Sequence, residues 1–293
     1  MKTKIRKAPK TMTVFELYKK CTARLEKDGI DDASLDARLL VECACGISHG
    51  EFLLKRDRQA SDEEVSKAEI YTEKRLSGKP VQYITGKWEF LDMEFSVGEG
   101  VLIPRPETEE LVMYAFEKIK NMKKPVVFDL CSGSGCIGLS IKNLCPDADV
   151  YMVEKSDEAL RFLEKNRIDL GFGNNTVLVK GDILKGYEGF AFLPKPDVII
   201  SNPPYIKTAE IATLQKEVQN EPHMALDGGE DGYIFYRCLS EKWLPFINDG
   251  GFIAIECGEE QAVDIAAMFS KNAAETEIIN DFNGTERMVS AFR

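Results

Sequence analysis

Asn-Pro-Pro-Tyr at residues 202–205 closes the apolar run PDVIIS and brings an unusual set of hydrogen-bonding groups together. Because Pro203 and Pro204 lack N–H groups and stiffen the backbone, a strand must stop there in a rigid turn. The Asn202 side-chain oxygen and a main-chain carbonyl of this turn can accept both hydrogens of a planar –NH₂ group. The Tyr205 ring can stack on the flat face of the same group. This pattern turns the nitrogen lone pair toward an electrophile and predicts methylation of an amide or aryl amine.

A glycine-rich loop, DLCSGSGCIG at residues 129–138, suggests what the electrophile is. Its G-x-G-x-x-G spacing, which begins at Gly133, matches the fingerprint of dinucleotide-binding loops. Glu154, at the end of the next apolar run, offers a carboxylate for ribose hydroxyls. Dinucleotides and S-adenosyl-L-methionine both carry that ribose, so these residues predict a nucleoside ligand without choosing between the two. Asp129 favours S-adenosylmethionine, since it would repel a pyrophosphate but can orient the loop or reach a cationic amino group.

The segments that carry these residues alternate between strand and helix patterns. Five predicted strands are PVVFDL, DVYMVE, NTVLVKGD, PDVIISN and GGFIAIECG, and helical segments join them. The last two strands, ETEIIND and RMVSAFR, are separated by little more than FNGTE and are expected to pair antiparallel. We therefore predict an α/β fold with a mostly parallel, doubly wound sheet of seven strands. Glu154 and Asn202 are both expected at its carboxyl edge, where ligands of such sheets bind.

The chain before this region has a different pattern. Residues 13–78 contain four short amphipathic stretches with capping-box spacing at Thr13 and Ser61, and they predict a small helical bundle without visible chemistry. The next segment is rich in β-branched and aromatic residues and predicts a hairpin around Leu91-Asp92. The expected organisation is a basic flexible tail (1–12), a helical substrate-recognition domain (13–78), a β-hairpin linker (79–100) and a catalytic domain (101–293).

Composition argues against several classes of protein. No apolar run approaches the roughly 18 residues of a membrane-spanning helix, and no apolar segment follows the basic start, so a cytoplasmic protein is expected. Eight cysteines without a C-x-x-C pair and only two histidines argue against a metal site. Residues 1–80 carry 17 Lys or Arg against 14 Asp or Glu, whereas the remainder carries 21 against 35. The excess of negative charge over residues 81–293 argues against stable DNA binding.

Taken together, the motifs resemble those of a known family. DLCSGSG, Gly181-Asp182 and SNPPY are similar to motifs of class I S-adenosylmethionine-dependent amino-methyltransferases. LIPRPETEELV upstream and EPHMALDGGEDGYIFYR downstream narrow the resemblance to the release factor glutamine methyltransferases (the PrmC/HemK family), from about residue 13 onward. This resemblance implies a helical N-terminal domain, a β-hairpin linker and a Rossmann-like catalytic domain. It also implies methyl transfer to the side-chain amide nitrogen (N5) of the glutamine in the Gly-Gly-Gln motif of class 1 peptide chain release factors, which modulates translation termination.

The resemblance assigns roles to individual residues. The implied cofactor contacts are Asp129, Cys131, Ser132, Gly133, Ser134, Gly135, Glu154 through ribose, Asp182 and Ile183 around adenine, and Asn202. The implied substrate contacts are Asn202, Pro203, Pro204, Tyr205, Arg105, Glu221 and Pro222. The helical domain is a candidate for gripping the release factor, and a monomer is expected.

Two positions depart from the family pattern. The family usually has glycine at the position of Cys131 and often aspartate at that of Glu154. Cys131 must therefore adopt a negative φ or accept backbone strain. The longer side chain of Glu154 is expected to shift the ribose contact without removing the carboxylate.

Three other functions stay open from the residues alone. A nucleic-acid methyltransferase acting on adenine N6 or cytosine N4 shares NPPY, but it would need a basic cleft or a target-recognition domain. The hypothesis of an NAD-dependent oxidoreductase depends only on the glycine spacing. No acid/base residue is evident at the strand ends for it, because His49 and His223 lie away from them. A binding module that merely holds a nucleoside leaves NPPY without a purpose.

Overall fold

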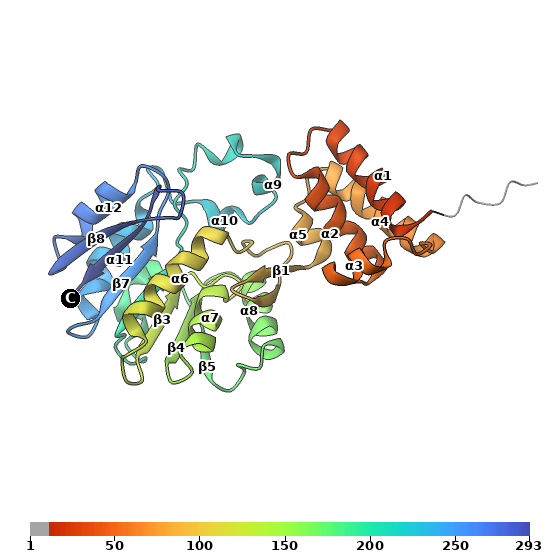
Figure 1. Cartoon of the computed structure of the whole chain (residues 1–293). Helices are drawn as coiled ribbons and strands as arrows, with labels where there is room; N and C mark the ends of the chain where they lie inside the picture. The colour runs from red at the N-terminus through yellow and green to blue at the C-terminus, as the bar shows by residue number, and fades with distance from the viewer. Residues whose placement is uncertain (1–11) are drawn as a thin grey trace, which may run out of the picture. The chain divides into compact units, whose positions relative to one another are not determined.

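A computed structural model describes residues 12–293, and the chain forms two compact units whose boundary in the sequence falls between Gly86 and Lys87. The tail predicted over residues 1–12 lies outside the described residues except for Met12. Figure 1 labels the helices and strands of both units. Within residues 12–293, no helix is long and apolar enough to cross a membrane, and no group of His, Cys, Asp or Glu side chains could hold a metal ion.

The first unit is built from five helices. They are α1 (Val14–Lys27), α2 (Ala33–Cys45), α3 (His49–Lys55), α4 (Asp62–Leu76) and α5 (Val81–Thr85). Capping boxes start α1 at Thr13, α3 at Ser48 and α4 at Ser61. The helices bury an apolar core that includes Leu17, Leu25 and Leu40. Residues 81–85, for which the sequence predicted extended structure, are helical and end at Gly86 in the left-handed region.

The second unit opens with the hairpin β1 (Lys87–Phe90) and β2 (Met93–Ser96). Its two-residue turn lies at Leu91 and Asp92, where the sequence predicts one, and their φ angles are 46° and 60°. Two successive positive φ angles are typical of the type I′ turns that match the twist of a hairpin.

The predicted seven-stranded sheet is confirmed. Its strands are β3 (Val126–Leu130), β4 (Asp149–Glu154), β5 (Thr176–Lys180), β6 (Val198–Ser201), β7 (Phe252–Glu256), β8 (Glu275–Asn280) and β9 (Glu286–Phe292), in the order β5-β4-β3-β6-β7-β9-β8. All neighbours pair parallel except β9, which runs antiparallel to both β7 and β8. The chain order reverses between β3 and β6, which opens a ligand crevice at their carboxyl ends.

Helices and short turns cover the sheet. The helices are α6 (Pro106–Ile119), α7 (Cys136–Leu144), α8 (Asp157–Asp169), α9 (Lys216–Gln219), α10 (His223–Leu226), α11 (Ile234–Lys242) and α12 (Ala262–Phe269). The 3₁₀ turns are η1 (Ile183–Lys185), η2 (Tyr187–Phe190), η3 (Ile211–Thr213) and η4 (Leu244–Phe246). Because side chains alternate along β3, Phe128 joins one apolar cluster and Val127 another, and each face of the sheet is buried.

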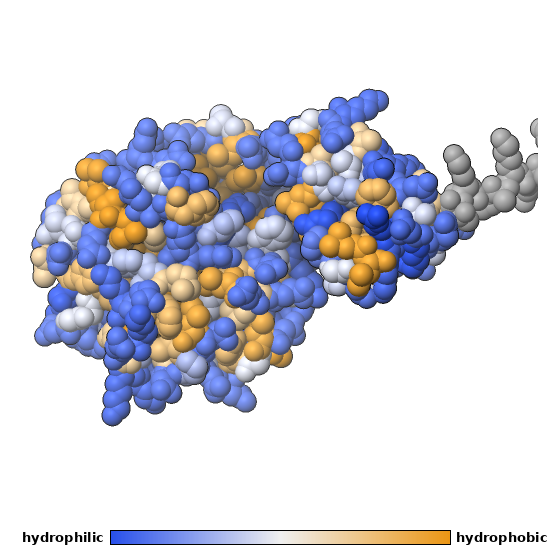
Figure 2. All heavy atoms as spheres, in the orientation of Figure 1, coloured by the Kyte–Doolittle hydropathy of each residue, from blue (hydrophilic) through white to orange (hydrophobic). Residues whose placement is uncertain are grey.

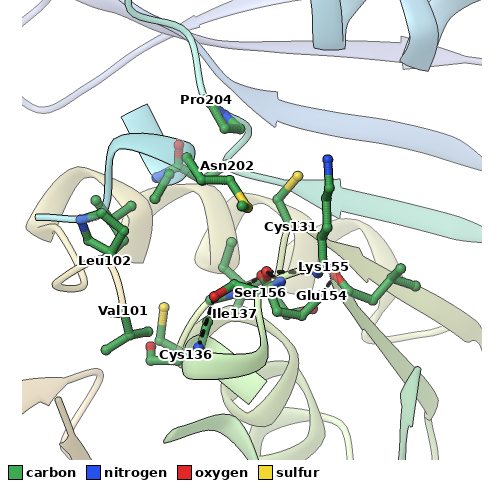
Figure 3. A pocket seen from close by; sticks show the side chains of 18 of the residues that line it. Val101, Leu102, Cys131, Cys136, Ile137, Glu154, Lys155, Ser156, Asn202 and Pro204 are labelled. Atoms are coloured by element: carbon green, nitrogen blue, oxygen red, sulfur yellow. Dashed lines mark hydrogen bonds between the residues drawn. The ribbon is translucent and has the colours of Figure 1, made fainter. Parts of the chain in front are cut away.

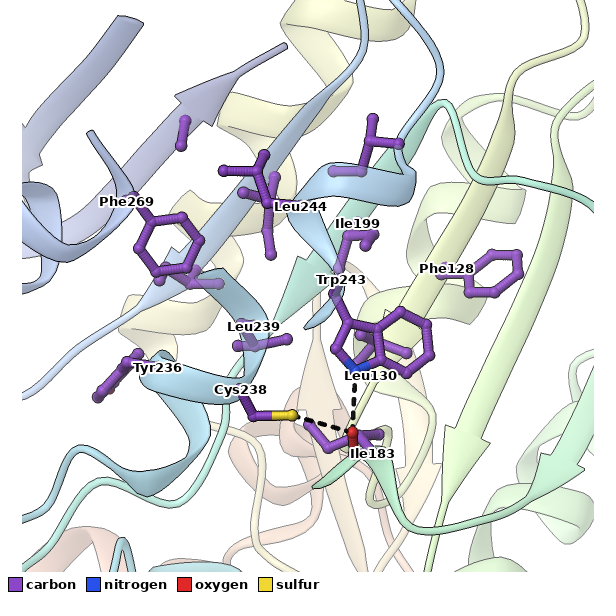
Figure 4. Packing of buried hydrophobic residues seen from close by; sticks show 14 of the residues in the cluster. Phe128, Leu130, Ile183, Ile199, Tyr236, Cys238, Leu239, Trp243, Leu244 and Phe269 are labelled. Atoms are coloured by element: carbon purple, nitrogen blue, oxygen red, sulfur yellow. Dashed lines mark hydrogen bonds between the residues drawn. The ribbon is translucent and has the colours of Figure 1, made fainter. Parts of the chain in front are cut away.

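The cluster that contains Phe128 also supports a loop at the carboxyl edge. Trp243 is fully buried, and its indole N–H donates to the Ile183 carbonyl at 2.9 Å (Figure 4). The Cys238 thiol lies 3.3 Å from the same oxygen. These contacts fix η1, the turn that carries Ile183, against the core.

Candidate active site

A single cavity at the carboxyl edge of the sheet gathers most of the predicted site residues (Figure 3). It is lined by Arg105, Cys131, Ser132, Gly133, Ser134, Glu154, Asp182, Ile183, Asn202, Pro204 and Pro222. The predicted residues that do not line it are Asp129, Gly135, Pro203, Tyr205 and Glu221. The cavity therefore brings most of the predicted cofactor residues and Asn202 to one place, whereas the five others lie outside its lining.

The glycine loop between β3 and α7 approaches the cavity with its backbone. Cys131 adopts φ = 63°, so it accepts the strain of the left-handed region instead of the negative φ that a cysteine prefers. Gly133 has φ = 54° and open space where a Cβ would point, which leaves room for a ligand beside the main chain. Burial and the nearby Glu154 and Asp129 raise the pKa of the Cys131 thiol well above its usual range, so this cysteine stays a neutral thiol.

Glu154 is held by backbone N–H groups from two sides. Its Oε1 accepts hydrogen bonds from Lys155 and Ser156, both at 2.7 Å, and its Oε2 accepts one from Gly133 at 2.9 Å. The side chain is 9% exposed and lines the cavity. The oxygens of a carboxylate offer about four acceptor positions, and these three bonds leave one of them for a ribose hydroxyl.

Asp129 lies behind the loop. Its Oδ2 accepts a hydrogen bond from the Gly138 N–H at 2.9 Å, whereas its Oδ1 is buried and has no partner among the described residues. Burial raises the pKa of Asp129 to about 7. A Cβ at Gly138 would lie 2.6 Å from Met152 Cγ, so the third glycine of the loop allows α7 to approach β4 closely. Asp129 thus anchors the first turn of α7 in this structure.

Asp182 and Ile183 form another part of the wall. Asp182 accepts a hydrogen bond from the Leu184 N–H at 3.0 Å and pairs with Lys155 at 2.9 Å. Burial raises the pKa of Asp182, but the Lys155 ammonium and the Leu184 N–H outweigh it, and the net pKa is lowered. A carboxylate beside the apolar Ile183 and Val153 fits a flat heterocycle with polar edges.

The buried hydroxyl of Ser134 gives an independent test of whether a nucleoside fits here. Ser134 lines the cavity, and its Oγ has no hydrogen-bond partner among the described residues. A buried polar atom without a partner is costly unless a ligand or water satisfies it. Together with the acceptors Glu154 and Asp182, this hydroxyl gives the cavity polar groups that fit S-adenosylmethionine.

Asn202 faces the cavity with a fixed side chain. Its Nδ2 donates to Thr108 Oγ1 at 3.1 Å, and the Thr108 hydroxyl donates to Glu256 Oε2 at 2.6 Å. No residue within 12–293 donates a hydrogen bond to Asn202 Oδ1. This oxygen is therefore available to an amine in the cavity.

Two glycines allow another segment of the chain to pack closely against the turn that follows Asn202. A Cβ at Gly232 would lie 2.6 Å from the Tyr205 carbonyl oxygen, and one at Gly228 would lie 2.8 Å from Tyr205 Cα. Gln261 Nε2 also donates to the Tyr205 carbonyl at 3.2 Å. The Tyr205 ring packs against the cluster that contains Phe128, and burial raises the pKa of its phenol above the usual range. The glycines of ALDGGEDG thus let the chain pack closely against NPPY.

Arg105 and Glu221 form an ion pair beside the cavity. Glu221 is 6% exposed and also accepts a hydrogen bond from the Ile103 N–H at 2.9 Å. Its carboxylate therefore fixes the segment before α6, while Arg105 lines the cavity. Pro222, directly after Glu221, lines the cavity itself.

Two residues linked to Asn202 were not predicted from the sequence: Thr108, which also lines the cavity, and Glu256. Thr108 lies inside the motif PRPETEE, where a threonine at the start of a helix looks like an ordinary capping residue. Glu256 ends the apolar strand β7, as Glu154 ends β4. A carboxylate at the end of a buried strand was the signal that could have found it.

Comparisons with known proteins agree with this geometry. The PrmC N-terminal domain family matches residues 16–86, and the family described as Conserved hypothetical protein 95 matches residues 81–261. A release factor glutamine methyltransferase from Caulobacter vibrioides is 34% identical over 281 residues, which cover 95% of this chain and 96% of that protein. One from Moorella thermoacetica is 31% identical over 284 residues, 96% of this chain and 99% of that protein.

A solved structure supports the fold alone. The catalytic domain of hMettl16 in complex with MAT2A 3′UTR hairpin 6 aligns with a TM-score of 0.55 at 12% identity, over 80% of this chain and 84% of that one. The Rossmann-like fold predicted for this chain is therefore confirmed. The methyltransferase relatives and the polar groups of the cavity support S-adenosylmethionine as the cofactor in preference to NAD. Relatives above 30% identity span almost the whole sequence, and the chain belongs to the family of release factor glutamine methyltransferases.

Proposed function

We propose that this enzyme transfers the methyl group of S-adenosyl-L-methionine to the side-chain N5 of the glutamine in the Gly-Gly-Gln motif of class 1 peptide chain release factors, and so modulates translation termination. The observation that carries the proposal is the unshared Oδ1 of Asn202 in the same cavity as Glu154 and Asp182. An acceptor at this place suits an amide –NH₂.

The residues divide into two sets. Glu154 would accept from a ribose hydroxyl, Asp182 and Ile183 would flank the adenine, and the loop Cys131–Gly135 would follow the methionine tail. When bound, the cofactor supplies a sulfonium methyl group that a nucleophile can take in line. Asn202 Oδ1 and the Pro203 carbonyl would accept the two amide hydrogens, with Tyr205 packed beside them.

No strong base is required for this reaction. The glutamine nitrogen forms the new bond to carbon, the sulfur keeps the electron pair of the broken bond, and the nitrogen then loses a proton to solvent. Most of the acceleration would come from positioning, since well-oriented groups reach effective molarities of about 10⁵ M or more. The stiffness of Pro203-Pro204 serves this purpose.

The first unit, including the predicted helical domain at 13–78, is proposed to grip the release factor. Its helix α3 exposes Leu53 and Leu54, the latter at 87%, and Figure 2 shows apolar surface on this unit. We further propose that the enzyme is a cytoplasmic monomer that does not bind DNA stably, with the hairpin β1–β2 lying in the proposed linker at 79–100.

The test is to incubate the enzyme and radiolabelled S-adenosylmethionine with one of three substrates at a time. The substrates are release factor, release factor whose Gly-Gly-Gln glutamine is replaced by alanine, and DNA. Label should enter only the release factor that retains the glutamine. Label on DNA with none on release factor would overturn the proposal in favour of a nucleic-acid methyltransferase.

A further inference from the structure

The Thr108 hydroxyl lies between the Asn202 amide and the Glu256 carboxylate. It is 3.1 Å from Asn202 Nδ2 and 2.6 Å from Glu256 Oε2. The three residues come from α6, from the turn after β6 and from the end of β7. Thr108 and Glu256 are each only 2% exposed, so water does not compete with these bonds.

The direction of the two hydrogen bonds follows from chemistry. An ionised carboxylate only accepts, so the single Thr108 proton must point at Glu256. The lone pairs of the hydroxyl then face Asn202 and can be satisfied only by a donor, which is the Asn202 –NH₂. The Asn202 oxygen is consequently turned away from Thr108. With the opposite orientation, two acceptors would face each other at Thr108 and two amines would face each other in the cavity.

We propose that Thr108 and Glu256 are positioning residues that fix the Asn202 amide with its oxygen toward the substrate amine. The proposal rests on the proposed function and extends it, because the orientation of a terminal amide is otherwise free. Thr108 lines the cavity beside Asn202, whereas Glu256 does not line it and acts through Thr108.

The surroundings of Glu256 make the orientation of the Asn202 amide sensitive to pH. Burial raises the pKa of Glu256 to about 7, against the lowering effect of Thr108, Arg287 and Arg105 and with the raising effect of Glu107. The phenols of Tyr205 and Tyr236 are close by, and the Tyr236 hydroxyl donates to the Glu256 main-chain carbonyl at 3.0 Å. A protonated Glu256 can donate to Thr108, which frees the Thr108 proton and allows the Asn202 amide to flip.

The experiment compares full-length enzymes on a release factor substrate. Thr108→Val keeps the shape of the side chain without the hydroxyl, and its kcat should fall at least tenfold. The Kd for S-adenosylmethionine, measured by calorimetry, should change less than twofold, as should the KM for release factor. Thr108→Ser restores the hydroxyl and should recover most of the turnover. Ser140 in α7 carries another buried hydroxyl, so Ser140→Ala serves as the matched control and should keep wild-type kcat.

A second measurement does not depend on the folding of the valine variant. The kcat of the wild type should fall as the pH is lowered below about 7. Glu256→Gln should have a lower kcat than the wild type, and its kcat should not show this fall. A Thr108→Val enzyme with wild-type kcat, a Thr108→Ser enzyme as slow as the valine variant, or the same fall in kcat at lower pH in Glu256→Gln would each overturn the positioning role. A wild type that leaves release factor unlabelled would instead overturn the proposed function, and this inference with it.

Discussion

The Glu154 carboxylate accepts a hydrogen bond from the Gly133 backbone N–H at 2.9 Å, across 21 residues of sequence. One side chain thus joins the end of β4 to the glycine loop after β3. Its other oxygen is held by Lys155 and Ser156. The residue proposed to bind the ribose therefore also sets the position of the loop proposed to follow the methionine tail.

Replacing Glu154 should weaken cofactor binding more than the loss of one contact would. Glu154→Gln removes the charge and supplies an amide that cannot accept from all three N–H groups. Because hydrogen bonds to charged groups contribute about 1.5–3 kcal/mol, the Kd for S-adenosylmethionine should rise at least tenfold by calorimetry. Glu154→Asp, the residue common in the family, should bind more tightly than the glutamine variant. Equal affinity of the glutamine variant and wild type would contradict this role.

Asn202→Ala should separate chemistry from cofactor binding. The variant loses a preorganised acceptor, so kcat on release factor should fall at least tenfold. Cofactor affinity should fall little, because Glu154 and Asp182 remain. A labelled methyl-transfer assay together with calorimetry checks both, and unchanged turnover would remove Asn202 from the mechanism.

Cys131→Gly should stabilise the protein. A non-glycine residue at φ = 63° costs about 1–2 kcal/mol, and glycine adopts this conformation freely. The free energy of unfolding from denaturant titration should rise by about 1 kcal/mol after the greater entropy of the unfolded chain is subtracted. Cys131→Ala is the control, since it removes the thiol but keeps the Cβ and its strain. A gain for alanine equal to that for glycine would locate the effect in the thiol.

Gly232→Ala should disturb the NPPY turn. Gly232 has φ = 81°, and an added Cβ would meet the Tyr205 carbonyl oxygen at 2.6 Å. Gly250 has φ = 80° with open space around its Cβ position, so Gly250→Ala carries the backbone strain alone. Both variants should be destabilised, but only Gly232→Ala should also lose most of its kcat. Similar turnover in the two would show that the contact with Tyr205 is unimportant.

Asp129 should make stability fall as pH rises. Its folded pKa of about 7 lies above the usual value of an aspartate, so the folded state binds more protons than the unfolded state between roughly pH 4 and pH 7. Over that window this group removes stability at up to about 1.4 kcal/mol per pH unit. Asp129→Asn keeps an acceptor for Gly138 and does not titrate, so its stability relative to wild type should increase from pH 4.5 to pH 7. A constant difference across this range would contradict the raised pKa.

The sequence predicted the sheet well because its signals are local. Each buried strand is a short apolar run, and Glu154 and Asn202 follow the apolar residues of two of them, so both could be placed at one edge of the sheet from the sequence alone. The helix at 81–85 was missed because Val, Tyr, Ile and Thr favour strands, whereas Pro80 and Gly86 bound a single helical turn here. The sequence left open whether Cys131 adopts a negative φ or accepts strain, and the path of the loop imposes the strained conformation.

The partners of Asn202 could not be predicted for a different reason. Thr108 is 94 residues away in sequence and Glu256 is 148 residues from Thr108, and only the pairing of β6 with β7 beneath α6 brings them together. Glu221 shows the same limit: its motif placed it near the substrate, while its carboxylate is occupied by Arg105 and Ile103.

The fixed amide of Asn202 also bears on how many times one nitrogen can react. Two acceptors, Asn202 Oδ1 and the Pro203 carbonyl, suit a nitrogen that carries two hydrogens. After one transfer the nitrogen keeps a single hydrogen, so one acceptor loses its partner and the new methyl group occupies its place. We therefore expect the proposed site to bind the unmethylated amide more tightly than the monomethylated product, which favours a single methyl transfer.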